Sequence, residues 1–348
     1  MITILHVLAM SSFSGAENVV CQIISMFADD PDIRMVYCSP DGPIRKVLFE
    51  KNIEYEAMER FTIFELKKVI RRIQPDIIHA HDVRATVFAS IVCGKIKLIS
   101  HMHNNWEQLR KISIKGVLYE LSVKKASTVV WVSQSSFNQY RYAQTLREKS
   151  IILNNIIDVK KTREIASESI SEISFDIVSI GRMVYQKNPE RLIGIIEKVA
   201  KKKKNIRACI IGDGELFNKV SQLIQRKSLE TNIKLLGYME KPLGILLHSR
   251  VFLMSSRWEG TPMSVLESLA LGTPVVGTPV DGMLELVEDG LNGYLSDDDD
   301  VIADHIIDIV TNDALHNQLS DNAIKNSDER NSIIEYKEIL EGVYRGRR

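Results

Sequence analysis

The sequence predicts an α/β protein made of two Rossmann-like domains in tandem. Its 348 residues exceed the size at which a single hydrophobic core usually stops growing, so two domains are expected. Short apolar runs alternate with helical segments, as in a parallel sheet covered by helices on both faces. We expect domains at residues 1–165 and 166–330, joined at the polar segment 168–174, and a C-terminal helix at 331–348.

The apolar runs have the length and β-branched content of buried strands. In the first half they begin at Ile2, Ile33, Asp76, Lys97, Thr128 and Ser150. In the second half they begin at Phe175, Arg207, Ile233, Val251 and Pro274. Ligands of such sheets bind outside the carboxyl ends of the strands, so we expect the two domains to face each other across a cleft.

Composition and charge limit the class of protein. The chain is 45% hydrophobic and 26% charged, which excludes a disordered or fibrous protein. Its cysteines are scattered without metal-binding spacing, and no signal-peptide pattern opens the chain, so we expect a cytoplasmic protein. Residues 1–165 carry 23 basic and 17 acidic residues, whereas the rest carries 22 and 28. The basic half suggests contact with a membrane surface or another polyanion, although chance explains the difference equally well. We expect no nucleic-acid partner.

Arg182 and Lys187 lie in "GRMVYQKN", directly after a predicted strand. A guanidinium and an ammonium on one loop can hold a diphosphate and stabilise its charge as it leaves. Asn188 and Pro189 then predict a capped helix start. Two solvated surface cations are the alternative interpretation.

The segment "IIGDGE" contains Gly212 and Gly214 but lacks the third glycine of a dinucleotide fingerprint. A nicotinamide cofactor is therefore disfavoured. A tight strand-to-helix turn that lines a nucleotide pocket remains open.

Two carboxylates stand out in "SRWEGTPMSVLE". Thr261 is the predicted N-cap of a helix and Pro262 its first residue, so Glu259 and Gly260 lie in the preceding loop while Glu267 lies within the helix.

Carboxylates accept hydrogen bonds from sugar hydroxyls, and the free N–H groups at the helix start can face a phosphate between them. These N–H groups belong to Met263 and Ser264. The alternative is an acidic residue that favours the helix dipole, plus one solvated glutamate.

With these residues in view, "EGTPMSVLE" resembles the EX7E signature of the retaining, two-domain GT-B glycosyltransferases. This large bacterial family builds capsules, exopolysaccharides and lipopolysaccharides. Its other motifs have counterparts in the same order: "SGAE", "HMHN", "VSQSS", "GRMVYQKNPERL", "IIGDGE", "IKLLGY" and "GTPVVGTPVDGMLELVEDGLNGYL". The resemblance covers nearly the whole chain and is specific in the second half.

The resemblance implies a role for each matching residue. Arg182 and Lys187 would hold the donor diphosphate, Glu267 the ribose hydroxyls and Glu259 the hydroxyls of the transferred sugar. Gly15 would approach the diphosphate or the acceptor, and His103 would lie beside the reacting sugar. The remaining donor-binding positions would be Gly212, Gly214, Tyr238, Gly260, Thr261, Met263 and Ser264.

The family pattern also implies the reaction. A nucleotide-diphosphate sugar would be the co-substrate, with no metal or other cofactor, and a UDP-sugar is favoured over a GDP-sugar. The acceptor would be a growing, lipid-linked surface glycan, with the protein peripheral at the inner face of the membrane. A front-face substitution is favoured over double displacement because Glu259 is assigned to sugar hydroxyls. An epimerase of the same fold and a non-catalytic nucleotide-sugar-binding scaffold are the alternatives.

Three positions depart from the common family pattern. Pro262 replaces a glycine and lacks its N–H, Asn155 replaces a glycine and is expected in a left-handed turn, and "SGAE" keeps only Gly15 of a double glycine.

Three further segments have two interpretations each. His79 and His81 alternate on one strand face, and a polar pair is favoured over a metal site because no third ligand has suitable spacing. The run "SDDDD" at 296–300 is expected to be a solvated loop that leads into a helix rather than a metal motif. The basic, apolar segment 106–126 is either a lipid-binding helix or an ordinary surface helix, because its apolar positions form no clear stripe in the sequence.

Overall fold

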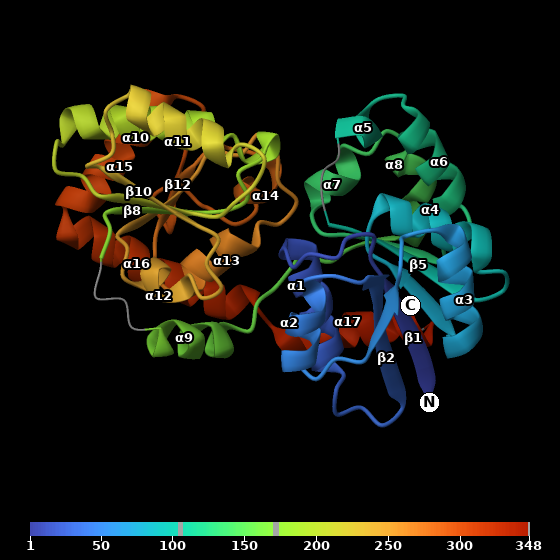
Figure 1. The fold of residues 1–348 in the computed structure, drawn as a ribbon. Coiled ribbons are helices and arrows are strands. Elements are labelled where there is room, and N and C mark those ends of the chain that lie inside the picture. Colours follow the sequence, from blue (N-terminus) through green and yellow to red (C-terminus); the bar gives the residue numbers. More distant parts are fainter. Residues whose placement is uncertain (104–106, 170–173, 347–348) are drawn as a thin grey trace. The chain divides into compact units, whose positions relative to one another are not determined.

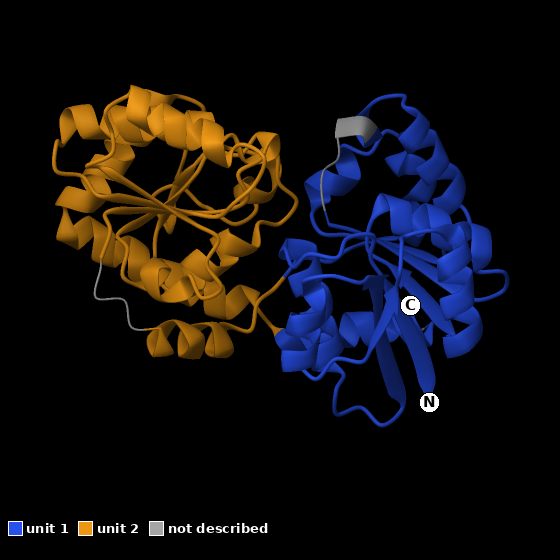
Figure 2. Cartoon of the chain, in the orientation of Figure 1, with its two compact units in different colours: residues 1–155, 333–348 blue, residues 156–332 orange. Residues whose placement is uncertain are grey.

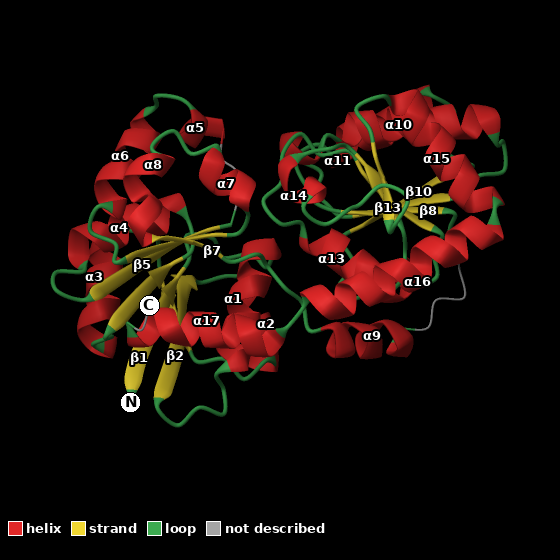
Figure 3. Cartoon of the chain, turned by 180° about the vertical axis from the view of Figure 1, so that it is seen from behind, coloured by secondary structure: helices red, strands yellow, loops and turns green. Residues whose placement is uncertain are grey.

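The structure of the chain is a computed structural model that describes residues 1–103, 107–169 and 174–346. The chain forms two compact units, one of Met1–Asn155 with Ile333–Arg348 and one of Ile156–Ser332 (Figure 2). Each unit contains a parallel sheet with helices on both faces (Figure 3). The predicted fold class, two Rossmann-like α/β domains, is confirmed.

The sheet of unit 1 has the strand order β3-β2-β1-β4-β5-β6-β7 (Figure 1). Its strands are β1 Ile2–Val7, β2 Ile33–Pro40, β3 Tyr55–Met58, β4 Ile77–Ala80, β5 Lys97–Met102, β6 Thr128–Trp131 and β7 Ser150–Ile152. All six predicted strands are present. Strand β3 was not predicted because it is an edge strand of four residues in which only Met58 is fully buried.

Helices cover both faces of this sheet. They are α1 Gly15–Met26, α2 Ile44–Glu50, α3 Ile63–Ile73, α4 Val83–Val92, α5 Glu107–Arg110, α6 Ile114–Val123, α7 Gln134–Asn138, α8 Ala143–Leu146 and α17 Ile333–Arg345, with a 3-10 turn at Arg147–Lys149. The side chains of Thr62, Asp82 and Ser113 cap α3, α4 and α6. Helix α17, the C-terminal one, packs in unit 1, where Lys97 donates to the carbonyl oxygen of Val343 at 2.5 Å.

The sheet of unit 2 has the order β10-β9-β8-β11-β12-β13. Its strands are β8 Ile177–Ile180, β9 Ala208–Ile211, β10 Ile233–Gly237, β11 Val251–Met254, β12 Val275–Gly277 and β13 Gly293–Leu295. Its helices are α9 Val159–Glu168, α10 Pro189–Lys202, α11 Phe217–Arg226, α12 Leu243–Leu247, α13 Met263–Ala270, α14 Asp281–Leu284, α15 Asp299–Thr311 and α16 Asp313–Arg330, with a 3-10 turn at Tyr185–Lys187. The edge strand β13 was not predicted because its three residues begin with a glycine, which is the only fully buried one among them.

The boundary between the units lies at Asn155/Ile156, ten residues before the expected one. Helix α9 belongs to unit 2 because Ala166 is buried in its core and Arg163 donates to the carbonyl oxygen of Ala270 at 2.9 Å. Part of the expected linker, residues 170–173, lies outside the described residues. The expectation for Asn155 was wrong, since it does not have a positive φ.

Strand order reverses direction between β1 and β4 in unit 1 and between β8 and β11 in unit 2. Such topological switch points open a crevice at the carboxyl edge of the sheet, because the flanking connections leave toward opposite faces. The loops after β8 and β11 carry the basic and acidic residues singled out above. No helix of the described residues is long and apolar enough to cross a membrane.

Candidate active site

The loops that follow β8 and β11 meet in unit 2. Their strands are neighbours, with Val251 paired to Ile177, so the two loops leave the same edge of the sheet side by side. As a result Lys187 and Glu259, far apart in sequence, form an ion pair with 2.7 Å between Nζ and Oε1. The Glu259 side chain is only 5% exposed and that of Lys187 20%, so this pair is largely removed from solvent.

Two further side chains hold the Glu259 carboxylate. Ser256 Oγ donates to Oε1 at 2.6 Å, and Gln186 Nε2 lies 3.4 Å from Oε2. Oxygen Oε1 is therefore fully engaged, while Oε2 has only one long contact and can accept a hydroxyl. Ser256 and Gln186 were not predicted as site residues, although Ser256 stands three residues before Glu259 and Gln186 adjoins Lys187.

Arg257 fastens the two loops together. Its backbone N–H donates to Gln186 at 2.8 Å, its guanidinium donates to Asn188 Oδ1 at 2.8 Å, and it lies over the ring of Tyr185. Asn188 has a left-handed backbone, and its side chain does not cap α10. Asn188 is the N-cap residue and Pro189 the first helical residue, as expected, but the cap hydrogen bond is not made because the Asn188 amide oxygen accepts from Arg257 instead.

Arg182 lies on the same loop but is exposed, and no described residue is its side-chain partner. A cavity of about 20 Å³, large enough for about one water molecule, is lined by Arg182, Lys187 and Ser256 among others. One cation of the predicted pair is therefore fixed by Glu259, and the other is free to turn toward a ligand.

Gly212 and Gly214 have positive φ and pack against the Arg182 loop. A Cβ at Gly212 would lie 1.9 Å from the carbonyl oxygen of Gly181, and one at Gly214 would lie 2.6 Å from that of Met183. The glycines let the two loops touch, so their evident role is to position Arg182. Tyr238 follows β10 and exposes its side chain.

Helix α13 begins at Met263, and Pro262 is its N-cap with an extended ψ of 115°. The expectation that Thr261 is the N-cap and Pro262 the first helical residue was therefore wrong by one position. Thr261 is buried, as is Gly260. A Cβ at Gly282 in α14 would lie 1.5 Å from the carbonyl oxygen of Gly260, so Gly282 allows this turn to pack closely.

The N-terminal part of α13 carries free N–H groups, which can bind a phosphate, and a carboxylate, which can bind sugar hydroxyls. Within the described chain, the N–H groups of Met263 and Ser264 have no acceptor. Met263, Ser264 and Glu267 are partly exposed at helical spacing, while Val265 and Leu266 are buried. Glu267 thus shares an accessible face with the helix start.

Glu267 has no hydrogen-bond partner for its carboxylate in the described part of the chain. Burial disfavours the charged form and raises the pKa of Glu267 to about 7. A carboxylate held without donors is ready to accept hydrogen bonds from a ligand.

Gly15 and His103 lie in unit 1. Gly15 is the exposed first residue of α1. His103 follows β5, is buried, and its Nε2 lies 3.0 Å from Nδ1 of His81. Burial lowers the pKa of His103 to about 3, so its imidazole is neutral at physiological pH.

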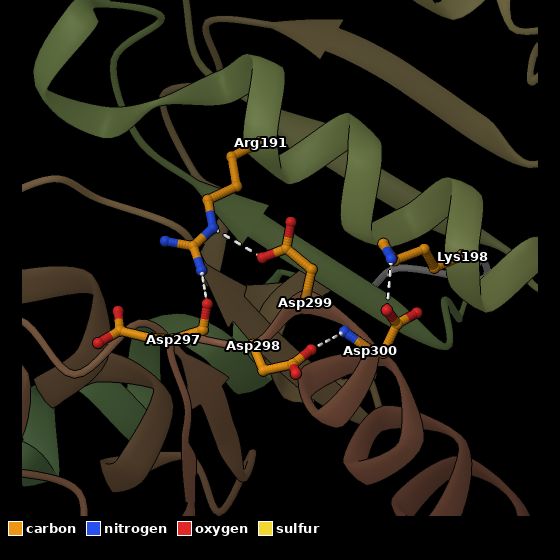
Figure 4. Close-up of a pocket in the computed structure, with 6 residues that line it drawn as sticks. All are labelled: Arg191, Lys198, Asp297, Asp298, Asp299 and Asp300. Carbon is orange, nitrogen blue, oxygen red and sulfur yellow. Dashed lines mark hydrogen bonds and ion pairs between the residues drawn. The ribbon is translucent and has the colours of Figure 1, made fainter.

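The aspartate run at 297–300 lies in a separate surface hollow (Figure 4). Asp298 caps α15 by accepting from the N–H of Asp300, while Asp299 pairs with Arg191 and Asp300 with Lys198, both at 2.7 Å. These acids serve helix capping and ion pairs, as expected for a loop that leads into a helix.

Two family models match the chain. The model described as Glycosyltransferase Family 4 matches residues 13–161, and the model described as Glycosyl transferases group 1 matches residues 160–326. Together they span almost the entire chain. The chain belongs to the group 1 glycosyltransferases.

Curated relatives of the chain are named as glycosyltransferases, and a solved structure shares its fold. An uncharacterised glycosyltransferase of Methanocaldococcus jannaschii is 29% identical over 67% of this chain and 63% of its own length. The UDP-Gal:α-D-GlcNAc-diphosphoundecaprenol α-1,3-galactosyltransferase of Escherichia coli is 24% identical over 98% of this chain and 95% of its own. The crystal structure of Anabaena HepE in complex with UDP and glucose matches with a TM-score of 0.88 at 19% identity, over 99% of this chain and 100% of that one. The last likeness establishes the GT-B fold.

Proposed function

We propose that this group 1 glycosyltransferase transfers a sugar from a UDP-sugar, with retention of anomeric configuration, to a growing, lipid-linked surface glycan. The observation that carries the proposal is the Lys187–Glu259 pair at the β8/β11 switch point, with the free Arg182 on the same loop. Two relatives support the choice of donor and acceptor: HepE was crystallised with UDP-glucose, and the Escherichia coli relative is named for a UDP-galactose donor and a diphosphoundecaprenol acceptor.

Different groups of the site would hold the diphosphate of the donor and the hydroxyls on either side of it. Arg182 and Lys187 would contact the diphosphate, together with the N–H groups of Met263 and Ser264 at the positive end of α13. Glu267, on the same face of α13, would accept from the ribose hydroxyls, and Oε2 of Glu259 would accept from a sugar hydroxyl.

The chemistry follows from the position of Glu259. Its carboxylate is fixed by Lys187 and Ser256, so we assign it to binding rather than to nucleophilic attack. In a front-face substitution the bond from the anomeric carbon to the phosphate oxygen breaks, and the acceptor oxygen bonds to the same face. The acceptor proton passes to the leaving phosphate, whose charge Arg182 and Lys187 stabilise without a metal ion.

Donor hydrolysis without acceptor tests this function. Purified protein should slowly release free sugar from a UDP-sugar, with retained anomeric configuration by NMR and with EDTA present. GDP-sugars should be hydrolysed more slowly. Binding of UDP-sugars without turnover, even with acceptor, would indicate the scaffold alternative, and an epimerised nucleotide sugar would indicate an epimerase.

Helix α6 supports the membrane-linked part of the proposal. Ile114, Val117, Leu118 and Leu121 recur at helical spacing and are 39 to 82% exposed. The earlier view that this segment lacks an apolar stripe was wrong, because the buried face is formed by other residues, such as Tyr119 and Val123. Lysines 111, 115 and 124 flank the stripe and are exposed. We propose that this face rests on anionic lipid, where the acceptor is held.

The double substitution Leu118→Glu/Leu121→Glu should weaken binding to phosphatidylglycerol-containing vesicles by roughly tenfold or more, because it removes two inserted apolar side chains and adds negative charge. Co-sedimentation measures this effect. Phe64→Glu is the matched control, since Phe64 is a single 78% exposed apolar residue on α3. Equal loss in the control, or no loss in the double variant, would refute a membrane role for α6.

A further inference from the structure

Five histidines gather at the switch point of the unit 1 sheet. His6 lies in β1, His79 in β4 and His101 in β5, while His81 and His103 directly follow β4 and β5. The fold brings them together from three sequence segments, and none of them is more than 8% exposed. Only His103 has been given a role in transfer.

Strand register explains why all five imidazoles meet. His6 pairs with His79 across β1 and β4, and Ala80 pairs with Ser100, so His81 is level with His101. Alternate residues of a strand share a face, and residues in register across parallel strands do so too. The rings accordingly lie close, with centroids 4.1 Å apart for His79 and His81 and also for His101 and His103.

The hydrogen bonds of the cluster leave several ring nitrogens without partners. His81 bridges His6 and His103, with nitrogen distances of 2.9 and 3.0 Å, and His79 contacts the Tyr344 hydroxyl. Both nitrogens of His101 are buried without a partner among the described residues, as are Nδ1 of His103 and Nε2 of His79. Buried polar atoms normally have partners because unpaired ones cost free energy. The cluster is therefore incomplete as an internal hydrogen-bond network.

The chemical state of these rings suits a metal ion. Burial holds the pKa of each imidazole below its ordinary value, to about 3 for His6 and His103, so all are neutral at physiological pH. A neutral imidazole has one lone pair available for coordination.

We propose that His81, His101 and His103 form a binding site for one transition-metal ion of the Zn²⁺ class. One ligand nitrogen from each ring lies within 4.8 Å of the others. Three imidazole nitrogens around a tetrahedral zinc ion, with bonds of about 2.0–2.1 Å, stand roughly 3.4 Å apart, so small side-chain movements suffice. Three histidines also leave one coordination position open for water or an anion.

A second group, His6, His79 and His81, meets the same distance criterion. It is the weaker candidate because His6 and His79 lie within strands, whereas His81 and His103 of the favoured group directly follow strands. In the favoured group, neither nitrogen of His101 has a partner among the described residues. From the sequence, a polar His79–His81 pair was favoured over a metal site because no third ligand was evident. The neighbouring strands supply such ligands, His6 from β1 and His101 from β5.

Zinc titration of the metal-stripped full-length protein by calorimetry tests this site without donor or acceptor, so its outcome is independent of the transferase assay. Wild type should bind one Zn²⁺ per chain. His101→Phe keeps a buried ring but removes both nitrogens, and it should weaken binding by at least roughly 100-fold, since even second-shell partners of metals are worth about 10–100-fold. His81→Gln should also weaken binding, and His248→Gln, at an exposed histidine of unit 2, should not.

Co²⁺ provides a spectroscopic check on the ligands. Bound Co²⁺ should show the visible absorption of a four-coordinate ion without a thiolate charge-transfer band. Circular dichroism of metal-free His101→Phe and His81→Gln shows whether each variant folds. One folded variant is enough to compare its zinc affinity with that of wild type. No stoichiometric zinc binding by wild type, wild-type affinity in folded His101→Phe or His81→Gln, or a thiolate band would each overturn the proposal.

Discussion

Replacing Lys187 with Met should lower both turnover and stability, whereas Arg182→Ala should lower turnover alone. Both cations are assigned to the leaving diphosphate, and loss of one preorganised electrostatic contact typically costs about 10²–10³-fold in turnover. Lys187 also neutralises the buried carboxylate of Glu259, so its loss leaves that charge with only Ser256 and Gln186. Breaking such a pair should reduce the free energy of unfolding by about 3 kcal/mol, the lower end for a buried pair, because the Lys187 side chain is 20% exposed. Arg182 is exposed and partnerless among the described residues, so stability should not change.

Single-turnover kinetics and urea unfolding of the two variants measure these effects separately. Lys198→Met is the control, because Lys198 pairs with Asp300 at the surface, where solvent screens the pair, and should contribute little to stability and nothing to turnover. Near-normal turnover in either active-site variant would refute the diphosphate role. Equal destabilisation by Arg182→Ala would show that the two cations are not divided between free and fixed roles.

Among the described residues, the sequence predicted every interior strand of both sheets, but of the four edge strands it predicted only β7 and β10. Interior strands such as β1 and β11 are buried on both faces and therefore appear as continuous apolar runs. The edge strands β3 and β13 are short and partly exposed, so their composition does not differ from that of loops. The expected boundary at 165/166 falls within α9, because packing against α12 and α13, not the composition of the helix, decides where it belongs.

The candidate site was predictable where a motif places residues at strand ends, as for Lys187 and Glu259. It was not predictable where the contact depends on tertiary structure. That Glu259 binds Lys187, that Arg257 takes the amide of Asn188, and that Gly212 makes room for Gly181 all follow from the adjacency of loops distant in sequence. The histidine cluster shows the same limit, because its members become neighbours only through the register of β1, β4 and β5.

Glu267→Gln should stabilise the free protein above neutral pH and weaken donor binding. Burial raises the pKa of Glu267 from 4.5 to about 7 in the folded protein, so between these values the folded state binds more protons than the unfolded state. The stability associated with the protonated form is fully present below pH 4.5 and is lost as pH rises through 7. The pKa shift corresponds to a loss of about 3 kcal/mol at most in the free energy of unfolding when Glu267 ionises. The glutamine of the variant cannot ionise, so the variant does not suffer this loss. Near pH 8 the variant should therefore be the more stable protein, and below pH 4.5 the difference should vanish.

Donor binding should depend on pH with the opposite sign. Ribose hydroxyls donate to the ionised carboxylate, so wild-type affinity for the donor should rise as pH increases through 7, with proton release on binding. In Glu267→Gln the affinity should be roughly 10- to 100-fold lower near pH 8, the value of hydrogen bonds to a charged acceptor, and flat over this range. Calorimetry in buffers of different ionisation enthalpy measures both quantities. Glu190→Gln is the control, because Glu190 is an exposed partner of Lys219 and should affect neither. On this view the site keeps the Glu267 carboxylate unpaired for the hydroxyls of the donor, and the protein is less stable as a result. Wild-type stability that does not fall between about pH 5 and 8 would contradict it, as would donor affinity that Glu267→Gln leaves unchanged.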